Sequence, residues 1–151
     1  MKIIILVFDK IIIPFVKLYW FIFKPKTQGV KVIVKFNDEI LLIKHSYGNK
    51  NVWTLPGGSI SKNETPEDAA KRECDEEVGI DLKNLKNHNN FLYDGEFKRN
   101  TIWVISGSAV NQSFRTNYEI GEARWFNIKN LPSNQSPLLQ KFLDLAGYNP
   151  L

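Results

Sequence analysis

Three glutamates, Glu73, Glu76 and Glu77, have the spacing that places side chains on one face of a helix. Three like charges on one face repel one another unless a cation lies among them. Carboxylate oxygens are hard donors, and such donors suit Mg²⁺ or Mn²⁺. The glutamates alone also fit the acidic face of any solvated surface helix, so the residues around them must decide between the two interpretations.

A glycine turn, Pro56-Gly57-Gly58, precedes these glutamates in the chain. Glycine lets a backbone approach a ligand closely, because it has no Cβ. A carboxylate-bound metal beside such a turn would neutralise a diphosphate and lower the pKa of an attacking water. A carboxylate that is not a metal ligand would serve as a general base. The residue types therefore suit the hydrolysis of a phosphate anhydride.

Residues 58–80, GSISKNETPEDAAKRECDEEVGI, contain the longer pattern G-x5-E-x7-R-E-U-x-E-E-x-G-U, where U is a bulky aliphatic residue. This pattern resembles the Nudix box, and it is far more specific than a lone glycine motif. The matching residues are Gly58, Glu64, Arg72, Glu73, Glu76, Glu77, Gly79 and Ile80. Cys74 occupies the one remaining defined position, where a small apolar side chain should serve. The preceding WTLPGG also resembles the family, and a weaker resemblance extends over Gly29–Leu145.

The resemblance to Nudix hydrolases implies an α/β fold in which a mixed sheet is packed between helices, an α/β/α sandwich. It implies that Glu76 and Glu77 are metal ligands and that Glu73 is a ligand or the general base. Arg72 would hold Glu73 through a salt bridge, and the carbonyl of Gly57 would join the metal shell. We therefore predict Glu73, Arg72 and Glu76 as catalytic residues, and Gly57, Glu73, Glu76 and Glu77 as ligands of Mg²⁺, with Mn²⁺ as the alternative.

Two further positions follow from the same resemblance. Glu64 would support the site. A downstream glutamate often completes it in the family, and both Glu119 and Glu122 are candidates.

The family cleaves nucleoside diphosphates linked to another moiety, and we expect a nucleoside triphosphate or a nucleotide sugar as the substrate. The polar loop His45–Asn51, which includes Tyr47, is interpreted as a surface loop, although Tyr47 could stack on a base. One alternative is a membrane-surface-associated hydrolase of lipid-linked diphosphates. Another is a catalytically weak nucleotide-sensing module, which the complete set of box glutamates disfavours.

The elements that position these residues can be predicted from periodicity and turn residues. Thr65 is an N-cap followed by Pro66, and Gly79 is a C-terminal glycine, so a helix should carry the glutamates. A second helix should begin at Ser136-Pro137 and end at Gly147. The predicted strands are Gly29–Phe36, Ile40–Lys44, Val52–Leu55, Phe91–Phe97, Thr101–Val110 and Glu122–Ile128. The sum is one mixed α/β domain, a Nudix hydrolase domain at residues 27–151.

Residues 1–26 differ from the rest in composition. Three apolar runs are interrupted by charges, and none reaches the ~18 residues of a spanning helix. On a helix, one narrow stripe would contain Lys2, Asp9, Lys10, Lys17 and Lys24. We predict an amphipathic, largely apolar helical segment that covers the domain's sheet or a subunit partner in a homodimer. A helix lying in a membrane surface is the alternative.

The composition sets limits on the function. The chain has 151 residues and a formal net charge of +4, and it has no cluster of basic and aromatic residues typical of a nucleic-acid binder. We therefore expect a nucleotide or another diphosphate-containing small molecule as the partner, and no nucleic acid. Cys74 is the lone cysteine, which fits a reducing compartment. We expect a cytoplasmic protein, and the alternative is a protein that also contacts the inner face of a membrane.

Overall fold

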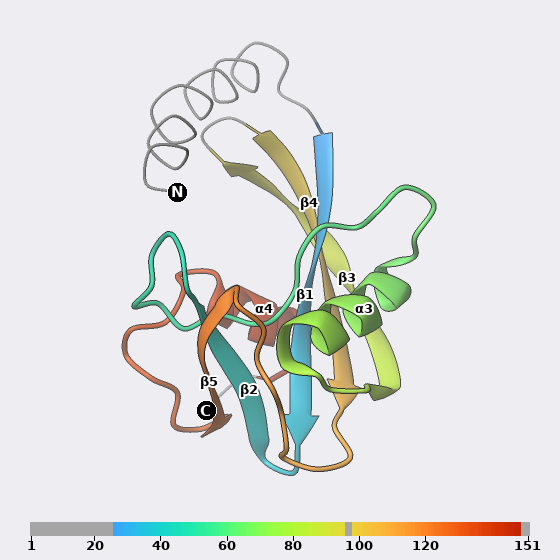
Figure 1. Cartoon of the computed structure of the whole chain (residues 1–151). Coiled ribbons are helices and arrows are strands. Elements are labelled where there is room, and N and C mark those ends of the chain that lie inside the picture. Colours follow the sequence, from blue (N-terminus) through green and yellow to red (C-terminus); the bar gives the residue numbers. More distant parts are fainter. Residues whose placement is uncertain (1–25, 96–97, 149–151) are drawn as a thin grey trace, which may run out of the picture.

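The computed structural model describes residues 26–95 and 98–148 of the chain. Within them lie five strands and two helices (Figure 1). The strands are β1 (Lys26–Phe36), β2 (Glu39–His45), β3 (Lys83–Gly95), β4 (Lys98–Ser108) and β5 (Ile120–Asn127). The helices are α3 (Pro66–Val78) and α4 (Leu139–Leu145).

The strands form one mixed sheet in the order β3-β4-β1-β2-β5. β1 pairs with β4 in parallel, and the pairs β1–β2, β2–β5 and β3–β4 are antiparallel. The segment that leads into α3 runs beside the first half of β1, where Val30 N–H donates to Gly58 O at 2.9 Å and Val32 N–H donates to Pro56 O at 2.9 Å. These bonds fix the glycine turn against the central strand of the sheet.

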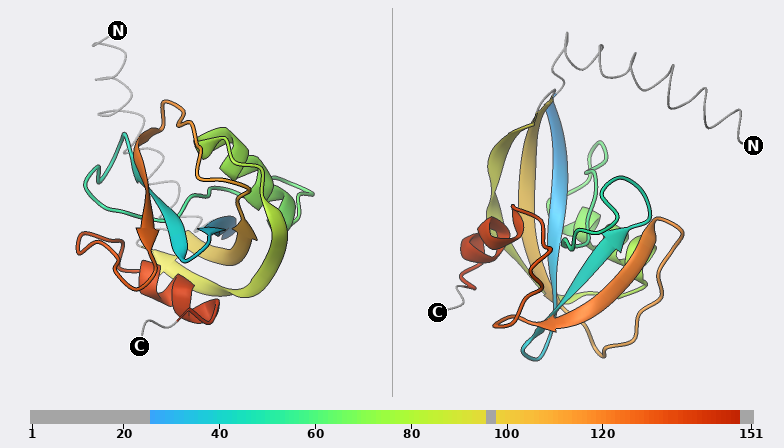
Figure 2. Two further views of the ribbon diagram at one scale, coloured as in Figure 1. Left: turned by 90° about the horizontal axis from the view of Figure 1, so that it is seen from below. Right: turned by 90° about the vertical axis from the view of Figure 1, so that its left-hand side faces the viewer.

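The two helices cover opposite faces of the sheet, as both views in Figure 2 show. Alternation along the strands produces this arrangement, since successive side chains point to opposite faces. Val30, Val32 and Val34 of β1 pack with the Ala70 and Cys74 face of α3. Ile33 packs instead into the core that α4 completes with Leu139, Phe142 and Leu143. The predicted α/β/α sandwich with a mixed sheet is therefore confirmed.

Helix α3 begins and ends where its capping residues predict. The Thr65 hydroxyl accepts a hydrogen bond from Asp68 N–H at 3.1 Å, and Pro66 occupies the first turn. Gly79 ends the helix in the left-handed region, with φ of 65°. These caps fix the register of α3 and therefore the direction of each box glutamate.

Several element bounds differ from the sequence prediction. β3 begins at Lys83, well before the predicted Phe91, because its polar first half still pairs with β4. The predicted strand Val52–Leu55 is reduced to isolated bridges, Ile43 with Thr54 and Trp53 with Gln135. Helix α4 begins at Leu139, and the turn at Ser136 precedes it.

The predicted helical segment at the amino terminus lies outside the described residues, except that Lys26 already belongs to β1. Among the described residues, no helix has the length and hydropathy that a membrane span requires.

Candidate active site

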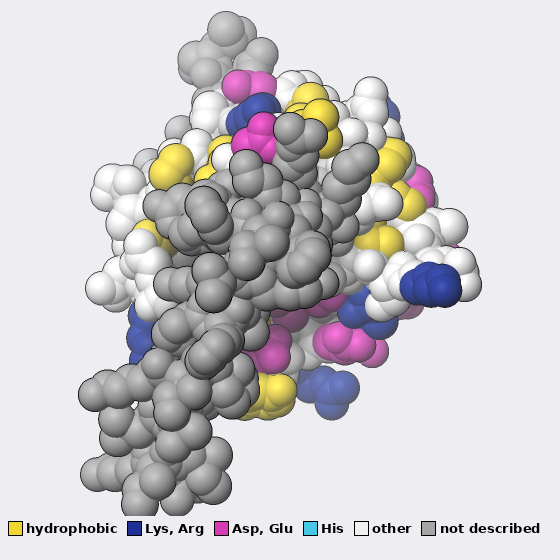
Figure 3. All heavy atoms as spheres, turned by 90° about the horizontal axis from the view of Figure 1, so that it is seen from above, with side chains coloured by type: hydrophobic (Ala, Val, Ile, Leu, Met, Phe, Trp, Pro, Cys, Tyr) yellow, Lys and Arg dark blue, Asp and Glu magenta, His cyan; other side chains and the backbone are white. Residues whose placement is uncertain are grey.

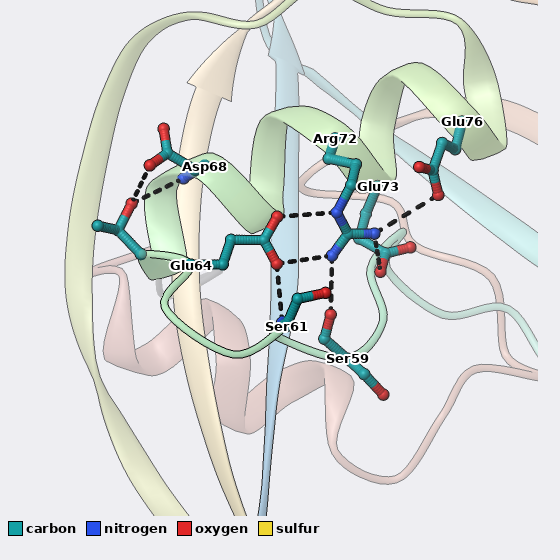
Figure 4. Close-up of polar contacts among 8 residues, drawn as sticks. Ser59, Ser61, Glu64, Asp68, Arg72, Glu73 and Glu76 are labelled. Atoms are coloured by element: carbon teal, nitrogen blue, oxygen red, sulfur yellow. Dashed lines mark hydrogen bonds and ion pairs between the residues drawn. The ribbon is translucent and has the colours of Figure 1, made fainter.

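Arg72 is the centre of an ion-pair network on α3 (Figure 4). Its Nε and Nη2 donate to the two carboxylate oxygens of Glu64, at 2.8 and 2.9 Å. Its Nη1 donates to Glu73 Oε1 at 2.8 Å and lies 3.5 Å from Glu76 Oε2. Nη2 also donates to the backbone carbonyl of Ser59 at 2.9 Å. The guanidinium thus ties the loop before α3 to two glutamates on the helix, and the predicted Arg72–Glu73 ion pair is present.

The pairing of Arg72 with Glu64 is bidentate, which is the strongest geometry for such a pair. Hydrogen bonds from Arg72, and one from Ser61 N–H at 2.8 Å, lower the pKa of Glu64 to about 2. The hydrogen bonds that Arg72 donates to Glu64 and Glu73 in turn raise the pKa of Arg72. Glu64 is therefore a charged support for Arg72 across the whole physiological pH range.

Glu77 lies on the buried side of the same helix, with 4% of its surface exposed. Its Oε2 accepts a hydrogen bond from Gly57 N–H at 2.9 Å. Burial, with a smaller contribution from the negative charges of Glu73 and Glu119, raises the pKa of Glu77 to about 7 against the opposing effects of Gly57 N–H and Lys31. A carboxylate in this position is destabilised when it is charged, and a cation beside it would relieve that cost.

The two glycines of the turn are required by close approach. Gly57 has φ of 132°, and a Cβ there would lie 2.1 Å from Val30 O. A Cβ on Gly58 would lie 2.5 Å from Glu73 Oε1. The carboxylates of Glu73 and Glu77 therefore lie directly against the backbone of the turn.

The side chains predicted to hold a metal fit a hard cation by their chemistry. Glu73, Glu76 and Glu77 offer carboxylate oxygens from one helix, next to the backbone of Gly57, and Glu77 carries a buried charge without a full cationic partner. In the described part of the chain, no three acidic, cysteine or histidine side chains converge closely enough to enclose an ion. Arg72 and the N–H of Gly57 hold the oxygens apart instead. Metal binding would compete with these hydrogen bonds.

Lys31 is a functional candidate that the sequence reasoning missed. Its ammonium donates to Leu55 O at 3.0 Å, just before the glycine turn. Burial lowers the pKa of Lys31, whereas the charges of Glu77 and Glu73 raise it. A lysine between two valines of the central strand, Val30 and Val32, was the available signal, because lysine is rarely buried without an acidic neighbour.

The two downstream glutamates have different surroundings. Glu122 is paired with Lys44 across the β2–β5 ladder at 2.9 Å and with Arg124 at 2.9 Å, and hydrogen bonding to Lys44 lowers its pKa. The charge of Glu119, by contrast, contributes to the raised pKa of Glu77. Glu119 therefore lies close to the carboxylate site, and Glu122 is engaged elsewhere.

Two further positions of the box, Cys74 and Glu76, lie on opposite sides of helix α3, one buried and one exposed. Cys74 is fully buried in the core beneath α3, and burial raises the pKa of its thiol, so it packs as an apolar side chain. The Glu76 side chain is 56% exposed and forms the solvent side of the site.

A family model and several known proteins match most of this chain. The family model described as NUDIX domain matches residues 25–145. The chain is 28% identical over 123 residues to the m7GpppN-mRNA hydrolase dcap-2 of Caenorhabditis elegans, covering 78% of this chain and 15% of that protein. It is 30% identical over 111 residues to the NAD-capped RNA hydrolase NudC of Vibrio parahaemolyticus, covering 67% and 38%. The chain thus spans well under half the length of these relatives.

Among solved structures, the fold is similar to that of a MutT NUDIX hydrolase from Burkholderia pseudomallei, with a TM-score of 0.72 and 23% identity. The match covers 80% of this chain and 98% of that one. At this identity the likeness concerns the fold. The residues that the family model matches include the glycine turn and helix α3, which carries the Arg72–Glu73 ion pair.

Proposed function

Since this chain belongs to the Nudix family, we propose that it hydrolyses the diphosphate linkage of a nucleoside diphosphate joined to another moiety, with Mg²⁺ as cofactor. One observation carries the proposal: the box residues are assembled, with Arg72 bonded to Glu64 and Glu73 while Glu77 lies on the N–H of Gly57. A nucleoside triphosphate or a nucleotide sugar remains the expected substrate. Capped RNA is the substrate in the names of the two relatives, and the expectation that no nucleic acid binds stays a prediction.

The metal would be held by Glu73, Glu76 and Glu77 together with the carbonyl of Gly57. When bound, Mg²⁺ supplies charge neutralisation of the diphosphate and a water of lowered pKa. We propose Glu119 as the downstream glutamate that completes the site, because its charge reaches Glu77, whereas Glu122 is neutralised by Lys44.

The chain's own residues have separable tasks. Arg72 orients Glu73 through Nη1, and Glu64 holds Arg72 in place. Glu73 has one oxygen on Arg72, so its second oxygen is the one that would either bind the metal or accept a proton from an attacking water as a general base. Lys31 would provide a positive charge that interacts with the carboxylates of Glu77 and Glu73.

One face of the molecule contains side chains of both charge signs. On the described part of the face shown in Figure 3, Asp and Glu side chains lie beside Lys and Arg side chains. A mixed surface suits a small phosphate ligand that binds through a metal, because binding then does not depend on a continuous basic face.

A substrate panel tests the proposal. In Mg²⁺ the full chain should convert nucleoside triphosphates to a nucleoside monophosphate and pyrophosphate, or nucleotide sugars to a nucleoside monophosphate and a sugar phosphate. It should lose this activity in EDTA and regain it when Mg²⁺ or Mn²⁺ is restored. Full turnover in EDTA would contradict the metal requirement, and no turnover of any diphosphate in Mg²⁺ would contradict the enzyme assignment.

A further inference from the structure

Two exposed tyrosines lie near the carboxylate site, on segments that are far apart in the sequence. Tyr47 follows β2 and is 56% exposed, and Tyr118 precedes β5 and is 87% exposed. Single exposed aromatic side chains are ordinary on a protein surface. Tyr47 and Tyr118 require an explanation because hydrogen bonds connect the segments that carry them, beside the box glutamates.

Ser46 connects the two segments through hydrogen bonds. Its N–H donates to Glu119 O at 2.8 Å, and its hydroxyl donates to Tyr118 O at 2.8 Å. The β2–β5 register shifts between Lys44 and His45, just before this contact. The loop that carries Tyr47 is therefore bonded directly to the segment that carries Tyr118 and Glu119.

His45 supports the Tyr47 ring. The two ring centroids are 5.1 Å apart and the ring planes are inclined by 32°. Burial lowers the pKa of His45, and the charge of Lys31 lowers it further, against the opposing charge of Glu119. The Nδ1 atom of His45 is buried and has no hydrogen-bond partner among the described residues. The two rings thus form an aromatic surface whose inner ring, His45, is partly buried.

The segment that carries Tyr118 is bonded to the helix that carries the proposed metal ligands, because Asn117 N–H donates to the backbone carbonyl of Glu77 at 3.3 Å. Burial raises the pKa of Tyr47, and the charges of Glu119, Glu77 and Glu73 raise it further. The phenol of Tyr118 acts on Tyr47 in the same direction. A ligand whose diphosphate lies at the carboxylates would therefore bring its next chemical group towards these rings.

We propose that Tyr47, supported by His45 and accompanied by Tyr118, stacks on the nucleobase of the substrate. This inference rests on the proposed function and assigns the side chain that would recognise the base of its substrate. A base stacks through its π face and needs no hydrogen-bond code, so several bases should be accepted.

An equilibrium binding experiment tests the stacking. The full chain in Mg²⁺ is titrated with the non-hydrolysable nucleotide α,β-methylene ATP and, separately, with methylenediphosphonate, which has the phosphorus groups and no base. Tyr47→Leu should weaken nucleotide binding roughly tenfold, the usual scale for the loss of one stacking partner. It should leave methylenediphosphonate binding unchanged. Tyr47→Phe keeps the ring and should bind the nucleotide like the wild type.

The matched control is Tyr93→Leu, because Tyr93 is also an exposed tyrosine, 41% exposed, but lies on β3. In addition, upfield shifts of the Tyr47 ring protons should appear on nucleotide addition. Tyr118→Leu gives a second variant should Tyr47→Leu fail to fold. Equal weakening of both ligands, or no weakening of nucleotide binding by either variant, would overturn the stacking role.

Failure of the inference is distinguishable from failure of the proposed function. Mg²⁺-dependent hydrolysis with binding that ignores Tyr47 and Tyr118 would remove only the stacking role. Nucleotide binding that requires Tyr47, without hydrolysis of any diphosphate, would support the stacking and contradict the enzyme assignment.

Discussion

Glu77 is the residue at which burial and charge conflict most strongly. Its carboxylate is 4% exposed, and Gly57 N–H is the hydrogen-bond donor placed on it. The pKa of about 7 means that the folded protein favours the protonated form by comparison with the unfolded chain, where the value is 4.5. An enzyme that needs a cation at this position can tolerate such a cost, because the bound cation removes it.

The buried charge of Glu77 should make the stability of the metal-free protein depend on pH. Because the pKa of Glu77 is raised on folding, its cost is absent below about pH 4.5, appears as pH rises, and is complete above pH 7. The full cost is on the order of 3 kcal/mol. In EDTA at pH 8, Glu77→Gln should therefore melt several degrees above the wild type. At pH 4 the two proteins should melt together, as thermal scans across this range would show.

Glu122→Gln is the control, because the charge of Glu122 should affect stability in the opposite direction from the charge of Glu77. The pKa of Glu122 is lowered by Lys44, so its charge stabilises the fold at pH 8 and this contribution is lost as pH falls. Its replacement should leave Tm unchanged or lower it slightly at pH 8, since the pair is partly exposed. A Glu77→Gln protein that melts below the wild type at pH 8 would show that the buried charge is not a cost.

The same residues determine catalysis in the proposed mechanism. Glu76→Gln and Glu77→Gln should each lower kcat at least on the order of 10²-fold, because each removes a charged ligand that contributes several kcal/mol through the metal. Asp75→Asn is the matched control, since Asp75 is exposed on the same helix directly before Glu76. Steady-state kinetics in Mg²⁺ would measure the three variants. Near-normal turnover of both glutamine variants would show that the ligands lie elsewhere.

At the scale of elements, the site is a junction between the turn at Gly57-Gly58 and helix α3. The turn is bonded to β1 and the helix is fixed by its caps, so Glu73 and Glu77 meet a backbone that is already positioned. Small changes at the junction should therefore separate folding from activity.

Gly58→Ala and Gly57→Ala provide this separation. A Cβ on Gly58 meets the flexible Glu73 carboxylate, so Gly58→Ala should displace Glu73, lower kcat and keep Tm close to the wild type. A Cβ on Gly57 meets the backbone carbonyl of Val30 at 2.1 Å and requires φ of 132°, so Gly57→Ala should lower Tm clearly. Thermal melts and kinetics distinguish the two. An active Gly58→Ala enzyme would show that the position of Glu73 against the turn is not needed.

At the scale of the whole molecule, both cores and the site lie within residues 26–148. Deleting residues 1–24 should therefore leave Mg²⁺-dependent hydrolysis intact. If the segment covers apolar surface, as we expect, its loss lowers Tm or causes aggregation, because buried apolar area contributes ~25 cal/mol per Å². If it lies in a membrane surface, Tm is unchanged and binding to phosphatidylserine vesicles is lost.

The truncated protein would be compared with the full chain in a melt, a vesicle sedimentation assay and the hydrolysis assay. Loss of hydrolysis by a truncated protein that still melts cooperatively would contradict the domain boundary near residue 27. An equally stable truncation of a full chain that ignores vesicles would contradict both roles of the segment.

The sequence by itself determined the parts of this protein that depend on local spacing. Thr65, Pro66 and Gly79 bound a helix through hydrogen bonds with near neighbours, and the i, i+3, i+4 spacing then places Glu73, Glu76 and Glu77 together. The alternation in β1 assigned its valines to one face for the same reason. The long edge strand β3 was partly missed, because its polar first half pairs with β4 and buries little of its own surface.

Only the tertiary structure decided which distant residues reach the site. Glu119 and Glu122 are three positions apart and equally plausible in the sequence, yet Lys44 on the neighbouring strand neutralises Glu122 while Glu119 acts on Glu77. Lys31 reaches the carboxylates for a similar reason: β1 runs directly behind the glycine turn. The electrostatic effect of a charge depends on its distance and on its burial, and both are properties of the packed chain.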